Sequence, residues 1–337
     1  MSTKGFDSLV NPSQKDIWRY AKLLGNIGEG SQLSSGQDEF TPLDRVGDLL
    51  IKREDKSITG SHKFRSLAYQ LTHLLAGGCT RAVLSSSGNA AISASHYAAQ
   101  AGVKLFTFLS EKTAPAKLAA IKTENIVPIL SKKPLRLAKY AAAKYNLPDL
   151  RPSRDPNAAI GFRSLGFELF EQNSKLDNIF TFVTSGASLK GISEAFRKLV
   201  EMRAVDKVPC LFAVYSEGKL AGGLSGGLKN KEQIEKVCRQ SGGGLVEVSD
   251  AEISSRENSF GTSAEGVASL IAAEKVKPGG QTVVIFTGRK WPKGEFDSNN
   301  FLRAENFADV DKIVSAIGGC PPQADEPLAQ ACGSGSW

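Results

Sequence analysis

The sequence is poor in the residues that most often hold metal ions. Its 337 residues include three His and five Cys, and none of the Cys form the closely spaced pairs of a metal site. An odd number of scattered Cys is typical of reduced thiols in a cytosolic protein. These counts predict no metal centre and no disulfide framework.

The sequence also lacks a long apolar run. Residues 1–16, "MSTKGFDSLVNPSQKD", contain no apolar core of signal-peptide length, and no later run reaches the length of a transmembrane helix. We therefore expect a cytoplasmic protein without a membrane partner.

Positive charge is in excess but not concentrated. The formal net charge is +7, and the Lys and Arg are scattered without interleaved aromatic residues that could stack on bases. A nucleic-acid partner is therefore not expected, and the charge fits solubility and attraction of anionic metabolites. A chain of this length with 41% hydrophobic residues can form two domains or one large α/β domain.

Strand-like and helix-like segments alternate through most of the chain. Apolar strands at 81–86, 104–110 and 126–131 are each followed by a helical pattern, and strands at 178–183 and 210–216 flank another helix. This alternation predicts an α/β fold of mostly parallel sheets covered by helices.

Three of the expected strands end in turns of small polar residues. These turns lie in "VLSSSGN" (83–89), "FVTSGAS" (182–188) and "VIFTGRK" (284–290). Since ligands bind at the carboxyl ends of parallel strands, the three turns predict a shared crevice.

Two of these turns suggest anion binding. Thr184 to Leu189 join a strand to a helix through small residues, so converging N–H groups and the helix dipole could cradle a phosphate. A tight turn without a ligand is the alternative. In the first turn, Ser86 and Ser87 could hold a carboxylate, and the Asn89 amide could donate to a ligand oxygen or simply cap the helix.

Two further side chains complete the candidate set. The Thr287 hydroxyl could bond a ring nitrogen, or Thr287 could merely end its strand. Lys63 in "TGSHK" begins an expected helix, where a partly desolvated amine beside a phosphate or aldehyde becomes a nucleophile. The alternative is an exposed helical Lys.

In this order the motifs resemble those of the pyridoxal-phosphate enzymes of fold type II, the tryptophan synthase β-subunit superfamily. The resemblance runs from about Trp18 to Lys290 and includes a Thr-Pro-Leu tripeptide at 41–43 and the strand segment "KRED" at 52–55. It implies two open, mostly parallel twisted sheets with pyridoxal 5'-phosphate in the cleft between two domains.

The resemblance also implies domain boundaries. The large cofactor-binding domain would comprise residues 1–75 and 160–325, and a smaller inserted α/β domain would comprise 76–159. Residues 326–337 would form a flexible tail. By analogy with such relatives, a homodimer is expected.

Residue roles follow from the same resemblance. Lys63 would form a Schiff base with the cofactor and take the substrate α-proton, Asn89 would bond the cofactor's phenolic oxygen, and Thr287 would face the pyridine nitrogen. The phosphate would be held by Thr184, Ser185, Gly186, Ala187, Ser188 and Leu189. The substrate carboxylate would lie among Ser86, Ser87, Gly88 and Ala90.

Within this superfamily the sequence is most similar to threonine synthases, which convert O-phosphohomoserine and water to threonine and phosphate. The similarity rests on "IWRYAKLL" (17–24), the Thr-Gly turn at Thr287, and "RDPNAAIGFRSLGFEL" (154–169). It implies a lyase of amino-acid metabolism that eliminates or replaces a β- or γ-substituent.

Several positions differ from the threonine synthase pattern. Ala158 replaces an Arg that could bind substrate phosphate, Arg163 replaces a Lys, and Ala90 replaces a Thr. His62 is similar to the tryptophan synthase β subunit, and "GTSAEG" (261–266) replaces a Glu-Pro segment.

These differences leave the substrate open. Arg154, Arg163 or Lys190 could bind a substrate phosphate instead. A serine/threonine dehydratase and a pyridoxal-phosphate-binding protein with little turnover remain alternatives.

Overall fold

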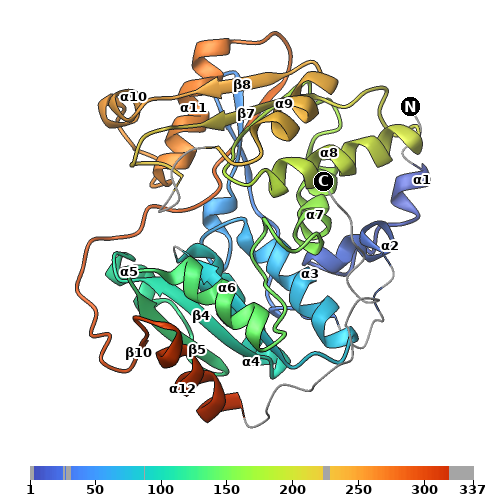
Figure 1. Cartoon of the computed structure of the whole chain (residues 1–337). Coiled ribbons are helices and arrows are strands. Elements are labelled where there is room, and N and C mark those ends of the chain that lie inside the picture. Colours follow the sequence, from blue (N-terminus) through green and yellow to red (C-terminus); the bar gives the residue numbers. More distant parts are fainter. Residues whose placement is uncertain (1–3, 26, 28–31, 87, 223–227, 319–337) are drawn as a thin grey trace. The chain divides into compact units, whose positions relative to one another are not determined.

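The chain forms two compact units in a computed structural model that describes residues 4–25, 27, 32–86, 88–222 and 228–318 (Figure 1). The larger unit contains residues Met1–Asn26, Ser34–Tyr69 and Asn157–Lys290. The smaller unit contains Ile27–Leu33, Gln70–Pro156 and Trp291–Trp337.

A six-stranded sheet organises the larger unit. Its order is β1-β2-β9-β6-β7-β8, and every neighbouring pair is parallel except β1 with β2. The strands are β1 (Leu43–Val46), β2 (Leu49–Lys52), β6 (Asn178–Phe182), β7 (Cys210–Tyr215), β8 (Gly244–Glu247) and β9 (Thr282–Ile285). Every residue of the central strands β6 and β9 is buried, because both faces of the sheet are covered.

Helices surround this sheet. They are α1 (Lys4–Asp7), α2 (Ala21–Leu24), α7 (Asn157–Gln172), α8 (Ala187–Glu201), α9 (Lys231–Gln240), α10 (Asp250–Ser255) and α11 (Ala264–Val276), with 3-10 turns η1 (Ile17–Tyr20) and η3 (Glu54–Lys56). Helix α3 (Lys63–Ala76) begins in the larger unit and continues into the smaller one.

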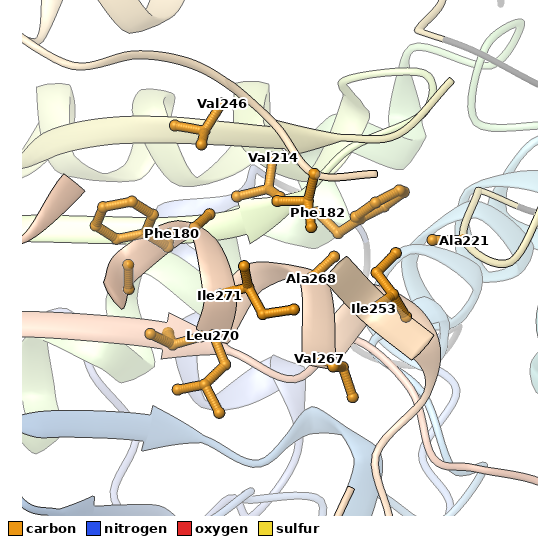
Figure 2. Packing of buried hydrophobic residues seen from close by; sticks show 14 of the residues in the cluster. Phe180, Phe182, Val214, Ala221, Val246, Ile253, Val267, Ala268, Leu270 and Ile271 are labelled. Atoms are coloured by element: carbon orange, nitrogen blue, oxygen red, sulfur yellow. The ribbon is translucent and has the colours of Figure 1, made fainter. Parts of the chain in front are cut away.

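The core of the larger unit lies between α11 and the sheet. Ala268 and Ile271 of α11 are buried opposite Phe180 of β6 and Val214 of β7 (Figure 2). Burying a large apolar side chain of this kind stabilises a fold by about 1.5–3 kcal/mol. The packing holds the start of α11 in a fixed place beside the sheet.

Helices α7 and α8 approach each other closely. A Cβ on Gly191 of α8 would lie only 2.4 Å from the carbonyl oxygen of Ala159 in α7. Glycine is therefore required at this crossing, and the close contact fixes the N-terminus of α8 beside α7.

The smaller unit contains a four-stranded parallel sheet. Its order is β10-β5-β4-β3, with β3 (Arg81–Ser86), β4 (Lys104–Ser110), β5 (Ile126–Ser131) and β10 (Leu302–Arg303). Its helices are α4 (Asn89–Ala101), α5 (Pro115–Ala119), α6 (Pro134–Lys144) and α12 (Phe307–Gly318). Tyr140 of α6 stacks on Phe307 of α12 with ring centroids 4.2 Å apart.

The predicted α/β fold with two mostly parallel sheets is confirmed, but the unit boundary differs near the C-terminus. The prediction placed residues 160–325 in the large domain, whereas β10 pairs with β5 and α12 packs on α6 in the smaller unit. A two-residue strand gives almost no periodic signal, so its partner could not be inferred from sequence. The predicted tail, 326–337, lies outside the described residues.

One finer expectation is also modified. Of the three polar turns, those after β6 and β9 lie on neighbouring strands of one sheet, whereas the turn after β3 belongs to the other sheet. Among the described helices, none combines the length and apolarity needed to cross a membrane.

Candidate functional site

The turn that precedes Lys63 is held in place by a dense set of hydrogen bonds. The Ser57 hydroxyl accepts from the Ser61 amide and donates to the Ser61 carbonyl, both at 3.0 Å. Ser61 also forms a bridge with Gly288, just beyond β9. The turn is therefore fixed against the segment that leaves the carboxyl end of β9.

Lys63 begins α3, as predicted, and its amine is perturbed by burial. The side chain is half-buried, and Nζ lies 5.4 Å from the centroid of the Phe162 ring. Desolvation lowers the pKa of Lys63 to about 8, although the Glu265 carboxylate on α11 acts in the opposite direction. Near neutral pH this amine is neutral far more often than an ordinary Lys, which makes it a better nucleophile and base.

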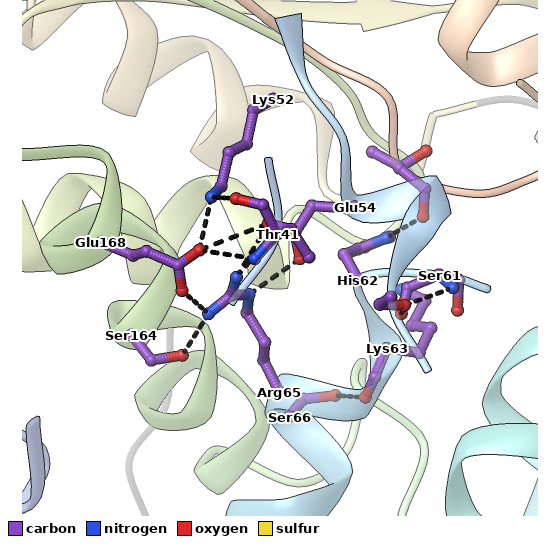
Figure 3. A network of polar contacts seen from close by, with 12 residues as sticks. Thr41, Lys52, Glu54, Ser61, His62, Lys63, Arg65, Ser66, Ser164 and Glu168 are labelled. Carbon is purple, nitrogen blue, oxygen red and sulfur yellow. Dashed lines mark hydrogen bonds and ion pairs between the residues drawn. The ribbon is translucent and has the colours of Figure 1, made fainter. Parts of the chain in front are cut away.

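A buried ionic network holds the other side of the same helix turn (Figure 3). Arg65 bonds both oxygens of Glu54 at 2.8 Å and pairs with Glu168 at 2.8 Å. Lys52 also pairs with Glu168 and donates to the Thr41 carbonyl at 2.7 Å. These contacts tie α3 to β2 and α7, so the position of Lys63 depends on them.

The predicted phosphate turn is the N-terminus of α8. Gly186 is its N-cap residue, with φ +80° and no capping side chain, and Ala187 is the first helical residue. Thr184 and Ser185 are half-buried, whereas Ser188 and Leu189 are buried. Amide groups at an uncapped helix start, together with the helix dipole, can bind an anion.

Thr287 lies on the same edge of the sheet as this turn. β9 and β6 are parallel neighbours, so the residues that follow them leave the sheet side by side. Thr287 is 6% exposed, and its carbonyl accepts hydrogen bonds from His62. The structure thus brings together three sequence-predicted elements in the larger unit: Lys63, Thr287 and the α8 turn.

The position where threonine synthases have Arg is part of a small apolar cluster. Ala158 is fully buried with Phe162 and Ala187. Arg163, one of the proposed substitutes for that Arg, donates to the Glu194 carboxylate at 2.8 Å. Lys190 is half-buried on α8, and Arg154 is exposed in the smaller unit.

The remaining predicted residues lie at the start of α4 in the smaller unit. The Ser86 hydroxyl accepts from the Gly88 and Ala91 amides at 3.0 and 3.1 Å. The alternative that Asn89 caps the helix is wrong, because Gly88 is the N-cap residue. Asn89 accepts instead from the Trp291 indole at 3.2 Å. Ala90 is half-buried, and Ser87 lies outside the described residues.

Sequence reasoning missed three neighbours of these groups. Phe162, Glu265 and Trp291 were not assigned any role, although each contacts or acts on a predicted residue. Phe162 and Glu265 lie in the segments 154–169 and 261–266 that were compared with threonine synthases, but only the packing of distant segments brings them near Lys63. Trp291, directly after "TGRK", was the one with a positional signal.

The sequence of the chain is similar to those of pyridoxal-phosphate-dependent enzymes. A family model described as pyridoxal-phosphate dependent enzyme matches residues 36–288. The chain is 26% identical over 210 residues to the biosynthetic L-threonine dehydratase of Pasteurella multocida, covering 59% of this chain and 41% of that protein. It is 25% identical over 195 residues to the threonine synthase of Mycobacterium bovis, covering 56% and 54%.

These matches span only about half of the curated relatives' length. Among solved structures, a pyridoxal 5'-phosphate-dependent aspartate racemase has a TM-score of 0.63 at 16% identity, covering 75% of this chain and 91% of that one. At that identity the likeness concerns the fold alone.

Proposed function

This chain belongs to the family of pyridoxal-phosphate-dependent enzymes, and we propose that within it the protein is a lyase that eliminates or replaces a β- or γ-substituent of an amino acid. The observation that carries the proposal is Lys63, a half-buried amine with a pKa of about 8 at the end of a rigid turn. A base tuned toward neutral pH is what α-proton removal requires.

The residues of the chain fit pyridoxal phosphate. Lys63 offers a nucleophilic amine for an aldehyde, and the uncapped start of α8 offers amide donors for a phosphate. Asn89 would bond the phenolic oxygen, and Thr287 would face the pyridine nitrogen. When bound, the cofactor supplies an electron sink that stabilises negative charge at the substrate α-carbon.

The chain's own groups would divide the remaining work. Lys63 would take the α-proton at Nζ, and the packed turn would keep that nitrogen in place. The Thr287 hydroxyl, unlike a carboxylate, would not hold a ring nitrogen protonated. A milder electron sink suits loss of a leaving group. Ser86, Gly88 and Ala90 would orient the substrate carboxylate at the start of α4.

The first candidate reaction is the threonine synthase reaction on O-phosphohomoserine. It is supported by the Thr-Gly turn at Thr287 and by similarity to a threonine synthase over about half of the chain.

The second candidate is deamination of threonine or serine, and a specific observation favours it. Ala158 replaces the Arg of threonine synthases and is fully buried, and Arg163 is occupied by Glu194. A substrate without a phosphate needs neither cation. Similarity to a threonine dehydratase points the same way.

One experiment separates these candidates. The purified protein, loaded with pyridoxal phosphate, is incubated separately with O-phosphohomoserine, threonine and serine. Threonine and phosphate from the first substrate support the synthase. A 2-oxoacid and ammonia from the others support the dehydratase. No turnover across a wider amino-acid panel, despite full loading, would favour a cofactor-binding protein without catalysis.

A further inference from the structure

His62 makes two hydrogen bonds to one carbonyl group. Its backbone amide donates to the Thr287 carbonyl at 3.0 Å, and its ring Nδ1 lies 2.8 Å from the same oxygen. Thr287 follows β9, 225 residues further along the chain. The residue directly before the reactive Lys is therefore bound to the residue expected beside the cofactor's ring nitrogen.

The partner decides the tautomer of the ring. A carbonyl oxygen only accepts hydrogen bonds, so Nδ1 must carry the proton and donate it. Burial lowers the pKa of His62 well below its ordinary value, and the neighbouring Lys63 lowers it further. The ring is then neutral, and Nε2 holds a lone pair rather than a proton.

Packing fixes the plane of this ring. His62 is 8% exposed and stacks on Phe162, with centroids 5.1 Å apart and an interplanar angle of 30°. Phe162 also lies under Lys63. One aromatic residue of α7 thus supports both the imidazole and the amine, so neither can turn without disturbing the other.

We propose that His62 is a positioning residue, which as a neutral Nδ1–H imidazole holds the Thr287 carbonyl and thereby aims the Thr287 hydroxyl at the cofactor's ring nitrogen. The inference rests on the proposed function. It links the Lys63 turn to the segment after β9 through one side chain.

Three substitutions test the donor. His62→Phe keeps the ring stack and removes the side-chain hydrogen bond. His62→Asn retains an N–H group bonded to Cγ, where Nδ1 stands, whereas His62→Gln moves it one atom further. The readouts are the affinity of the apoprotein for pyridoxal phosphate and the midpoint of the pH titration of the bound cofactor's absorbance.

We expect His62→Phe and His62→Gln to weaken cofactor affinity about tenfold and to shift the absorbance midpoint by about 0.5–1 pH unit, whereas His62→Asn restores both. In a Thr287→Val background, His62→Phe should produce no further shift of the midpoint. An unchanged titration in His62→Phe, or the same shift with and without the Thr287 hydroxyl, would overturn the proposal. So would a loss of thermal stability with no change in the titration.

The wild-type protein separates this failure from failure of the proposed function. If it forms no Schiff-base absorption with pyridoxal phosphate, the proposed function fails and the role of His62 fails with it. If the wild type instead forms the Schiff base normally while His62→Phe leaves the absorbance titration unchanged, the role of His62 fails and the proposed function stands.

Discussion

Lys63 and Arg65 are two basic residues of one helix turn with opposite electrostatic surroundings. Arg65 is fully buried, and two carboxylates, Glu54 and Glu168, neutralise it. Lys63 is half-buried beside the Phe162 ring, and burial lowers its pKa to about 8. The first cation serves the fold, and the second is the amine proposed to react.

The comparison shows how the helix can carry a reactive amine at its N-terminus, where a positive charge is unfavourable. The ionic network around Arg65 holds α3 rigidly, so Lys63 does not have to form an ion pair in order to be fixed. Reactivity and anchoring are thus assigned to different residues. Substitutions can therefore disturb either of the two separately.

Lys63→Ala should have the largest effect. We expect α-proton exchange of an amino-acid substrate to fall by about 10²–10⁴-fold or more, because the general base is removed. The fold should be retained, since the Arg65 network is untouched. Exchange is followed by NMR in deuterated water. Lys56→Ala, an exposed Lys of η3 whose pair with Asp44 is weak, is the control. Exchange that persists in Lys63→Ala would show that another group takes the proton.

Glu168→Gln should affect stability instead. Removing one charge from a buried pair leaves Arg65 and Lys52 poorly compensated and should cost about 3–5 kcal/mol in urea unfolding. Burial raises the pKa of Glu168, but Arg65 and Lys52 lower it more, to about 2. Its stabilisation is therefore present above pH 4.5 and is lost as the pH falls toward 2.

The control for that variant is Glu235→Gln, which breaks an exposed pair with Arg239. Its effect should stay within about 0.5 kcal/mol. Equal effects of the two substitutions would contradict the anchoring role of the Glu168 network.

Gly186→Ala should have an intermediate effect. Gly186 has φ +80°, and a Cβ there would lie 2.7 Å from the Ile234 side chain. We expect a loss of about 1–2 kcal/mol in stability and weaker binding of pyridoxal phosphate, measured by unfolding and by fluorescence titration. Gly279→Ala, where a Cβ meets nothing within 4 Å, should leave both unchanged. Undiminished cofactor affinity in Gly186→Ala would separate the α8 turn from phosphate binding.

The smallest expected effect is a shift on the pH axis. The rate at which the apoprotein forms a Schiff base with pyridoxal should rise with pH around a midpoint near 8, rather than near the ordinary Lys value of 10.5. The amine reacts when neutral, and burial lets it lose its proton earlier. Absorbance measured across pH 6–11 follows the reaction. A midpoint above about 10 would mean that burial does not tune Lys63.

Much of the site could be predicted because local chemistry marks it. Small polar turns after apolar strands identified the segments at Thr184 and Thr287, and the helix start at Lys63 was visible in the sequence. The α/β alternation likewise predicted the sheets. Each of these signals involves residues that are adjacent in the chain, so a single amino-acid sequence is enough to recognise it.

The missing parts depend on contacts between distant segments. The sequence around His62 does not indicate that His62 bonds Thr287. Likewise, the sequence around Glu265 does not indicate that its carboxylate affects the pKa of Lys63. Glu168 lay in the segment 154–169 without an assigned role, although it joins α7 to α3 and β2. The pairing of β10 with β5 was missed for the same reason.

The most direct test of the central claim is to reduce the pyridoxal-phosphate-loaded protein with borohydride and to map its peptides by mass spectrometry. Reduction makes the bond between the cofactor and its Lys permanent. The account predicts the cofactor mass on the peptide that contains Lys63. Cofactor mass on a different Lys, or on no Lys, would contradict it.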